Sequence, residues 1–181
     1  MTEIKSPYRR GADDGAWFGL YLIALFFSSV YSMRFPILGV VSFMLTVSVP
    51  LVTYMALRRT YISESLTTPV SSLWMQGIMM FLCGSSLMGA ASVVYMKWIN
   101  PSYLINNVST SAEVFGQMDD PEMQQIAEGL QRMVETNSLP TPITLVFTSI
   151  CLAVLTGSIL SLITGLLVRA FNPVRPRTIK K

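Results

Sequence analysis

Four long apolar runs, separated by polar segments, dominate the pattern of the chain. They cover residues 15–33, 36–57, 73–96 and 142–168. A helix rises about 1.5 Å per residue, so each run is long enough to cross a hydrocarbon core about 30 Å thick. The pattern therefore predicts an all-α fold, a four-helix transmembrane bundle spanning residues 15–169.

The segment between the third and fourth runs, residues 97–141, is the one sizeable polar stretch. Asp120 followed by Pro121 is typical of a helix start. Apolar residues then recur at helical spacing opposite Gln and Glu residues, which predicts a short amphipathic helix in this loop. We take its apolar side as a candidate partner face, made of Met123, Ile126, Leu130, Met133 and Val134.

This helix is too short to span a membrane, which takes about 20 residues. We expect it to lie flat at the outer membrane surface or across the outer end of the bundle. Its polar side carries Glu122, Glu128 and Glu135 against the single Arg132. Anionic lipid would repel that side, which favours the bundle or a partner protein as the cover for the apolar face.

Small residues recur at every fourth position of the last run, which puts them on nearly one face of a helix. Such residues let a second membrane helix approach closely. We call this set of small residues the ladder of the last run: Ser149, Ala153, Gly157, Ser161 and Gly165. The third run offers Gly84, Ser85 and Gly89, which we expect to be its partner face. The alternative, that the ladder lines a ligand path or pore, gains no support from any charged residue on it.

Four further expectations concern the two ends of the chain, the start of the first run and a proline inside the second. Residues 1–14 are polar and are expected to form a disordered or interfacial cytoplasmic segment. Asp13 and Asp14 are expected to cap the first helix, although a pair of catalytic carboxylates is the alternative reading. Pro50 is expected to kink the second helix, with Thr46 and Ser48 as candidates to satisfy the freed carbonyl. Residues 170–181 form a basic cytoplasmic tail.

Composition and charge agree with a membrane protein of the inner membrane. The chain is 51% hydrophobic and 13% charged, against about 25% charged in soluble domains. Its basic residues flank the runs unequally, and Lys and Arg concentrate on the cytoplasmic side. Both ends of the chain are therefore expected in the cytoplasm. One side carries Lys5, Arg9, Arg10, Arg58, Arg59, Arg169, Arg175, Arg177, Lys180 and Lys181, and the other carries Arg34, Lys97 and Arg132.

Little in the sequence favours catalysis. There is no histidine, and Cys83 and Cys151 fall inside apolar runs, where small buried cysteines are common. Between their ends the runs hold no ionisable residue of the kind that transporters and pumps retain. We therefore predict no enzyme, with no catalytic, cofactor-binding or metal residue and no cofactor. Membrane lipids are the expected surroundings, and nucleic acid is not an expected partner.

Two motifs carry a resemblance to a known family. Tyr95–Pro101 reads Y-M-K-W-I-N-P after a Gly-rich third run, and Gly157–Ile163 reads G-S-I-L-S-L-I before a basic end. With the acidic outer segment between them, the second half of the chain resembles the domain-of-unknown-function 4199 family of small bacterial inner-membrane proteins. The resemblance implies this topology and suggests an association with membrane glycosyltransferases of envelope synthesis.

Three functions follow from these patterns. The leading hypothesis is a structural or accessory subunit that binds another inner-membrane protein, or itself, through its helix faces or outer segment. A small oligomeric channel or transporter component is the first alternative, and conductance in liposomes would distinguish it. A subunit of a lipid-linked glycan system is the second, and it would depend on Asp13, Asp14 or the outer carboxylates.

Overall fold

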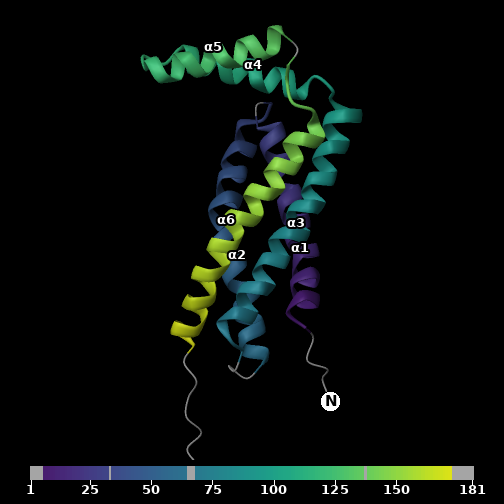
Figure 1. Ribbon diagram of the computed structural model, residues 1–181, viewed down its shortest axis with the longest axis vertical. Helices are drawn as coiled ribbons and strands as arrows, with labels where there is room; N and C mark the ends of the chain where they lie inside the picture. Colours follow the sequence, from purple (N-terminus) through teal and green to yellow (C-terminus); the bar gives the residue numbers. More distant parts are fainter. Residues whose placement is uncertain (1–5, 33, 65–67, 137, 173–181) are drawn as a thin grey trace, which may run out of the picture. The chain divides into compact units, whose positions relative to one another are not determined.

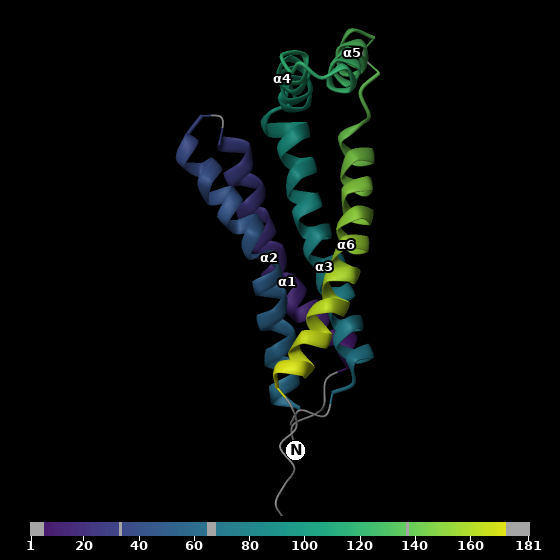
Figure 2. The same ribbon diagram turned by 90° about the vertical axis from the view of Figure 1, so that its left-hand side faces the viewer.

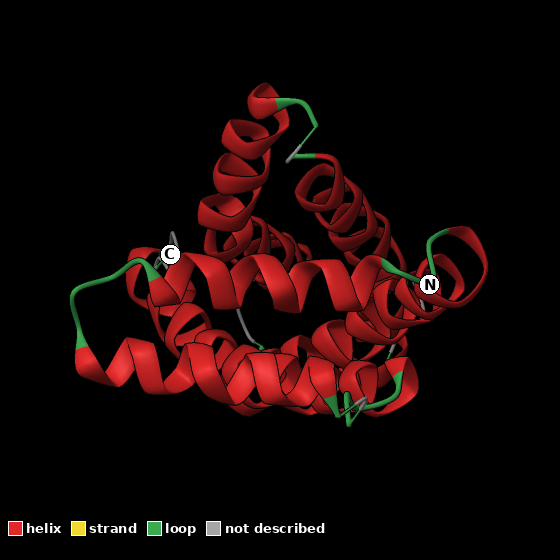
Figure 3. Cartoon of the chain, turned by 90° about the horizontal axis from the view of Figure 1, so that it is seen from above, coloured by secondary structure: helices red, strands yellow, loops and turns green. Residues whose placement is uncertain are grey.

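The computed structural model describes residues 6–32, 34–64, 68–136 and 138–172, and in these ranges the chain forms helices and no strand (Figure 3). The predicted all-α fold is confirmed. Four long apolar helices are packed as a bundle, and two short helices lie between the third and the fourth in sequence.

The four long helices match the predicted runs and extend beyond them (Figure 1). They are α1 Pro7–Tyr31, α2 Pro36–Ser63, α3 Val70–Val94 and α6 Pro142–Phe171. A π-helical turn, η1 Tyr95–Ile99, continues α3, so that 30 residues from Val70 to Ile99 run without a break. Each of these helices is long and apolar enough to cross a membrane. The chain is a multi-span membrane protein.

The expected start of the first helix was wrong. Ser6 is its N-cap and accepts a hydrogen bond from the Arg9 amide at 3.4 Å, and Pro7 occupies the first turn. Asp13 and Asp14 therefore lie inside α1 and do not cap it. Nothing between Pro7 and the apolar run breaks a helix, so the helix continues beyond the run. The second helix likewise continues to Ser63.

Two compact units divide the described chain, and each has its own packing. Unit 1 holds Met1–Met88 and Ser149–Lys181, and unit 2 holds Gly89–Thr148. In unit 1, α1 and α2 are antiparallel neighbours (Figure 2). Two apolar clusters form its core. The first contains Leu57, Tyr61, Leu73 and Val168, and the second contains Phe18, Met80 and Phe81.

Three glycines four residues apart place α1 directly against α3. A Cβ on Gly11 would lie 2.6 Å from the Gln76 carbonyl oxygen. A Cβ on Gly15 would lie 2.7 Å from the Cβ of Cys83, and one on Gly19 would lie 2.7 Å from Leu87. None of these positions has room for a side chain. This glycine row was not predicted, although it has the spacing of the ladder in the last run.

Pro50 lies inside α2, as predicted. The two hydroxyls expected to hydrogen-bond the carbonyl that it frees have other partners. The carbonyl that Pro50 frees belongs to Thr46, four residues earlier. The Thr46 hydroxyl donates to the Ser42 carbonyl at 2.9 Å, and the Ser48 hydroxyl donates to the Leu45 carbonyl at 3.0 Å. Tyr21 of α1 also donates to the Leu45 carbonyl. The expected repair was therefore wrong, and this turn instead ties α2 to α1.

Unit 2 contains a hairpin of two short helices, α4 Tyr103–Gly116 and α5 Pro121–Glu135. The start of α5 is as predicted: Asp120 is its N-cap and accepts from the Glu122 amide at 2.9 Å. Helix α4 was not predicted. Ala112 and Ala127 are buried where the two helices pack, because small side chains allow them to come close.

Candidate functional site

A network of polar side chains joins the start of α1, the end of α2 and the start of α3 in unit 1. Arg10 forms an ion pair with one carboxylate oxygen of Glu64, and Thr68 donates to the other. The Gln76 amide nitrogen donates to the Asp14 carboxylate at 2.7 Å and to the Thr60 hydroxyl at 2.8 Å. Three helices are thus tied together at one end.

Burial explains why these bonds form. Gln76 is 1% exposed, and a buried amide without partners would be costly. The side chains of Arg10 and Glu64 are 14% and 21% exposed, so the ion pair is largely withdrawn from water. Removing one partner of such a pair would leave an uncompensated charge and destabilise the fold. The main role of the network is therefore structural.

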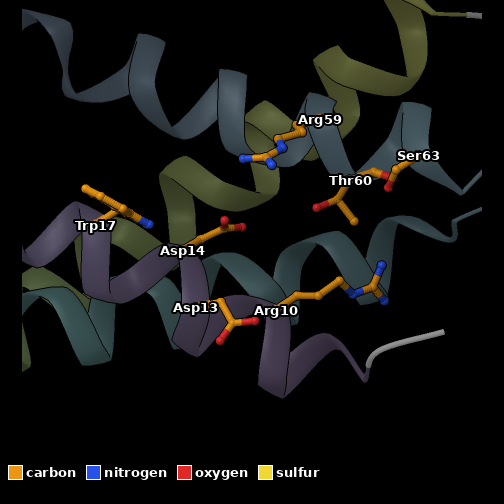
Figure 4. A pocket seen from close by; sticks show the side chains of 7 residues that line it. All are labelled: Arg10, Asp13, Asp14, Trp17, Arg59, Thr60 and Ser63. Atoms are coloured by element: carbon orange, nitrogen blue, oxygen red, sulfur yellow. The ribbon is translucent and has the colours of Figure 1, made fainter. Parts of the chain in front are cut away.

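A pocket of about 370 Å³ adjoins this network. In Figure 4 the side chains of Asp14 and Arg59 project into the same space, and Trp17 borders it. The lining residues come from the first turns of α1 and the last turns of α2: Arg10, Asp13, Asp14, Trp17, Arg59, Thr60 and Ser63.

A second cavity, of about 280 Å³, shares three of these residues and is mostly apolar. Asp14, Trp17 and Arg59 border both cavities. The second cavity extends along α1 and α2 away from these three residues, and Met80 of α3 also lines it. Its remaining lining residues are Phe18, Tyr21, Val52, Met55 and Ala56. We call the two cavities together the α1–α2 groove. It has charges of both signs at one end and apolar side chains at the other.

The groove was missed at the level of sequence, because its parts lie far apart in the chain. Arg10 and Glu64 are 54 residues apart, and Asp14 and Gln76 are 62 apart. One signal was present. Gln76 is an isolated amide within an apolar run, and a polar side chain in a membrane helix needs a partner on a neighbouring helix. Among the described residues, no three His, Cys, Asp or Glu side chains gather in a way that could hold a metal ion.

Three members of the predicted ladder lie against α3. A Cβ on Gly157 would overlap the Phe81 ring, at 2.2 Å, and the side chain of Ser161 faces Gly77. At Gly165 the nearest atom, the Cβ of Leu73, would be 3.7 Å away, an ordinary contact. Ala153 is half-buried and Ser149 is exposed.

On α3, one of the three predicted partner residues, Gly84, has its neighbours on a helix other than the expected one. Gly84 lies against Gly15, Phe18 and Gly19 of α1, so its expected pairing with the ladder of α6 was wrong. Ser85 is buried and donates to the Leu82 carbonyl at 3.3 Å, and Gly89 is buried. The spacing of small residues shows which positions share a face, but not which helix that face meets.

The candidate partner face on α5 is divided within the hairpin. Met123, Leu130 and Val134 are half-buried. Ile126 and Met133 are each 46% exposed. Three side chains of the predicted stripe are therefore partly covered, and the other two remain open.

Comparison with known proteins gives one match. The family model described as "Protein of unknown function (DUF4199)" matches residues 14–170, so it covers all four apolar runs and confirms the resemblance seen in the second half. No curated protein matches the chain. No solved structure matches it either.

Proposed function

The chain belongs to the DUF4199 family of proteins of unknown function, and we propose from its own residues that it is a non-catalytic accessory subunit that binds another protein of the bacterial envelope. Its place would be the inner membrane, and its contact surface would be the α4–α5 hairpin. The membrane glycosyltransferases that the resemblance suggests are the first class of partner to test.

The exposed apolar side chains of the hairpin are the observation that carries this proposal. Large apolar side chains normally find cover when they gather on a small element. The hairpin buries Ala112 and Ala127 between its helices, yet five larger apolar side chains stay exposed: Ile105, Val114, Met118, Ile126 and Met133.

Charge favours a protein over lipid as the cover. The hairpin segment carries six acidic residues and one basic residue, Arg132, which pairs with Glu128 at 3.6 Å. Anionic headgroups would repel such a segment. A protein with basic residues around an apolar patch would complement it, since charges at the rim of an interface guide association. The acidic residues are Glu113, Asp119, Asp120, Glu122, Glu128 and Glu135.

The absence of histidine from the sequence supports the non-catalytic part of the proposal. So does the use of the carboxylates near the pocket. Glu64 is held by Arg10 and Thr68, and Asp14 is held by Gln76. These bonds tie helices together, so the carboxylates have a structural role in the fold.

Site-specific photo-crosslinking in cells tests the proposal. A photoreactive residue at Ile126 or Met133 should crosslink to one envelope protein, whereas the same residue at Gln125 or Gln131 on the polar side should not. The protein identified in this way is then purified with the full chain. Ile126→Ser with Met133→Ser should weaken that complex about tenfold or more, because each change removes apolar area that the partner would bury.

A matched double variant provides the control. Gln125→Ser with Gln131→Ser changes the same helix at exposed polar positions and should leave the affinity unchanged. Crosslinks to lipid alone, or equal affinity for both double variants, would contradict the proposal.

A further inference from the structure

We propose that the α1–α2 groove binds one phospholipid whose headgroup carries both a phosphate and a primary ammonium group, as an ethanolamine phospholipid does. The phosphate would lie at Arg59, the ammonium group at Asp14, and an acyl chain would follow the apolar cavity between α1 and α2. This site is separate from the hairpin and does not depend on the function proposed for it.

Arg59 is the cation that the groove offers to an anion. The groove is lined by two arginines, and Arg10 is committed to Glu64. Arg59 makes no hydrogen bond or ion pair to another of the described residues, although it borders both cavities. A guanidinium group binds phosphate through two parallel N–H donors, which makes arginine well suited to this headgroup.

Asp14 is the anion for the ammonium group. It is half-buried, and the Gln76 amide holds one of its oxygens at 2.7 Å. Gln76 is neutral, so this bond fixes the orientation of the carboxylate and leaves its charge in place. Figure 4 shows the Asp14 carboxylate turned toward the same space as Arg59. A zwitterionic headgroup matches two opposite charges that share one pocket.

The apolar cavity continues from this charged end. Both cavities border Trp17, whose side chain is 76% exposed, and tryptophan is enriched at the level of the headgroups. From Asp14 to Tyr21 the groove follows seven residues of α1, a rise of about 10 Å. With the charged end among the headgroups, a groove of this length would reach the acyl chains, and Val52, Met55 and Met80 line its apolar part.

The same charges discriminate between lipids. A glycerol headgroup carries the phosphate alone and offers no cationic N–H donor to the Asp14 carboxylate. A choline headgroup carries a cation with no N–H donor, so it can attract the Asp14 carboxylate but cannot donate to it. We therefore expect the affinity to fall from ethanolamine to choline to glycerol phospholipid.

Native mass spectrometry of the full chain in detergent measures this order, with the three phospholipids carrying identical acyl chains. The ethanolamine lipid should bind at least about tenfold more tightly than the glycerol lipid, since it adds a charge-assisted hydrogen bond. Arg59→Gln should weaken all three lipids about tenfold. Asp14→Asn keeps an oxygen for Gln76 and should remove the preference for ethanolamine.

Neighbouring positions supply the controls. Arg58 lies beside Arg59 on α2, is exposed and does not line the groove, so Arg58→Gln should bind the lipids as the wild type does. Ala56→Phe should block the apolar cavity and weaken all three. Equal affinity for the three lipids in the wild type, or equal effects of Arg58→Gln and Arg59→Gln, would overturn the proposal. Arg59 is exposed, so its variant remains decisive even if Asp14→Asn fails to fold.

Discussion

The hydroxyl of Ser161 is fully buried against α3 and has no hydrogen-bond partner among the described residues. A buried polar group without a partner costs about 1–3 kcal/mol. We therefore expect Ser161→Ala to keep the stability of the protein or raise it by up to about 1 kcal/mol. Thermal unfolding in detergent measures the change.

Ser161→Leu is the opposite test at the same position. The side chain faces Gly77, where there is no room for a larger group, so we expect a loss of about 1–3 kcal/mol. Leu166→Ile, at an exposed position of α6, is the control and should change little. If Ser161→Ala were clearly less stable than the wild type, the hydroxyl would have a bonding partner and the expectation would be wrong.

At single residues, the sequence predicted which small residues share a packed helix face better than it predicted which helix that face contacts. Gly157 and Gly165 belong to one ladder by their spacing. The Phe81 ring packs directly against Gly157, whereas Gly165 has space for a methyl group. The size of the opposing side chain decides this difference. That side chain lies on another helix, so no local pattern reports it.

At the scale of the element, the glycine row of α1 gives a sharp expectation. Gly15→Ala would bring a Cβ to 2.7 Å from the Cβ of Cys83 and 3.1 Å from the Met80 carbonyl oxygen, so the helices must separate. We expect a loss of about 1–3 kcal/mol in stability from this overpacking. Thermal unfolding in detergent is again the measurement.

Gly39→Ala on α2 is the matched control, because a Cβ there would be 3.7 Å from the nearest atom, the Cβ of Ser32. It should be neutral or slightly stabilising, since alanine favours a helix more than glycine does by about 1 kcal/mol. The same loss in both variants would mean that glycine flexibility, and not close approach, matters at Gly15.

The elements that the sequence missed share a physical cause. Helix α4 contains Asn, Ser and Thr residues that disfavour isolated helices, and its packing against α5 stabilises it. The first turns of α1 carry charges that interrupt the apolar run but do not interrupt a helix. Hydropathy therefore located the membrane cores of the long helices, while their ends depended on caps and on partners from other helices.

At the scale of the whole molecule, the number and order of the spans followed from hydropathy alone, because about 20 apolar residues have few alternatives to a membrane helix. The α1–α2 groove did not follow. It needs α1, α2 and α3 to meet at one end. Two of the contacts that hold them, the Arg10–Glu64 ion pair and the Gln76–Asp14 hydrogen bond, join residues more than fifty positions apart. Such contacts depend on the packing order of the helices, which similar apolar runs do not specify.

The orientation of the protein in the membrane is the last prediction. The start of α1, the end of α2 and the end of α6 carry Arg9, Arg10, Arg58, Arg59 and Arg169, all in unit 1. The expected basic tail, Arg175 to Lys181, and Lys5 lie outside the described residues. The positive-inside rule places these ends in the cytoplasm and the α4–α5 hairpin outside.

Reporter fusions after Glu64 and after Lys181 should be active only as cytoplasmic reporters, and a fusion after Gln117 only as an external one. Because α2 extends to Ser63, Glu64 is the first position after the complete helix. A C-terminal fusion active outside the cytoplasm would reverse the topology and would move the groove to the outer leaflet.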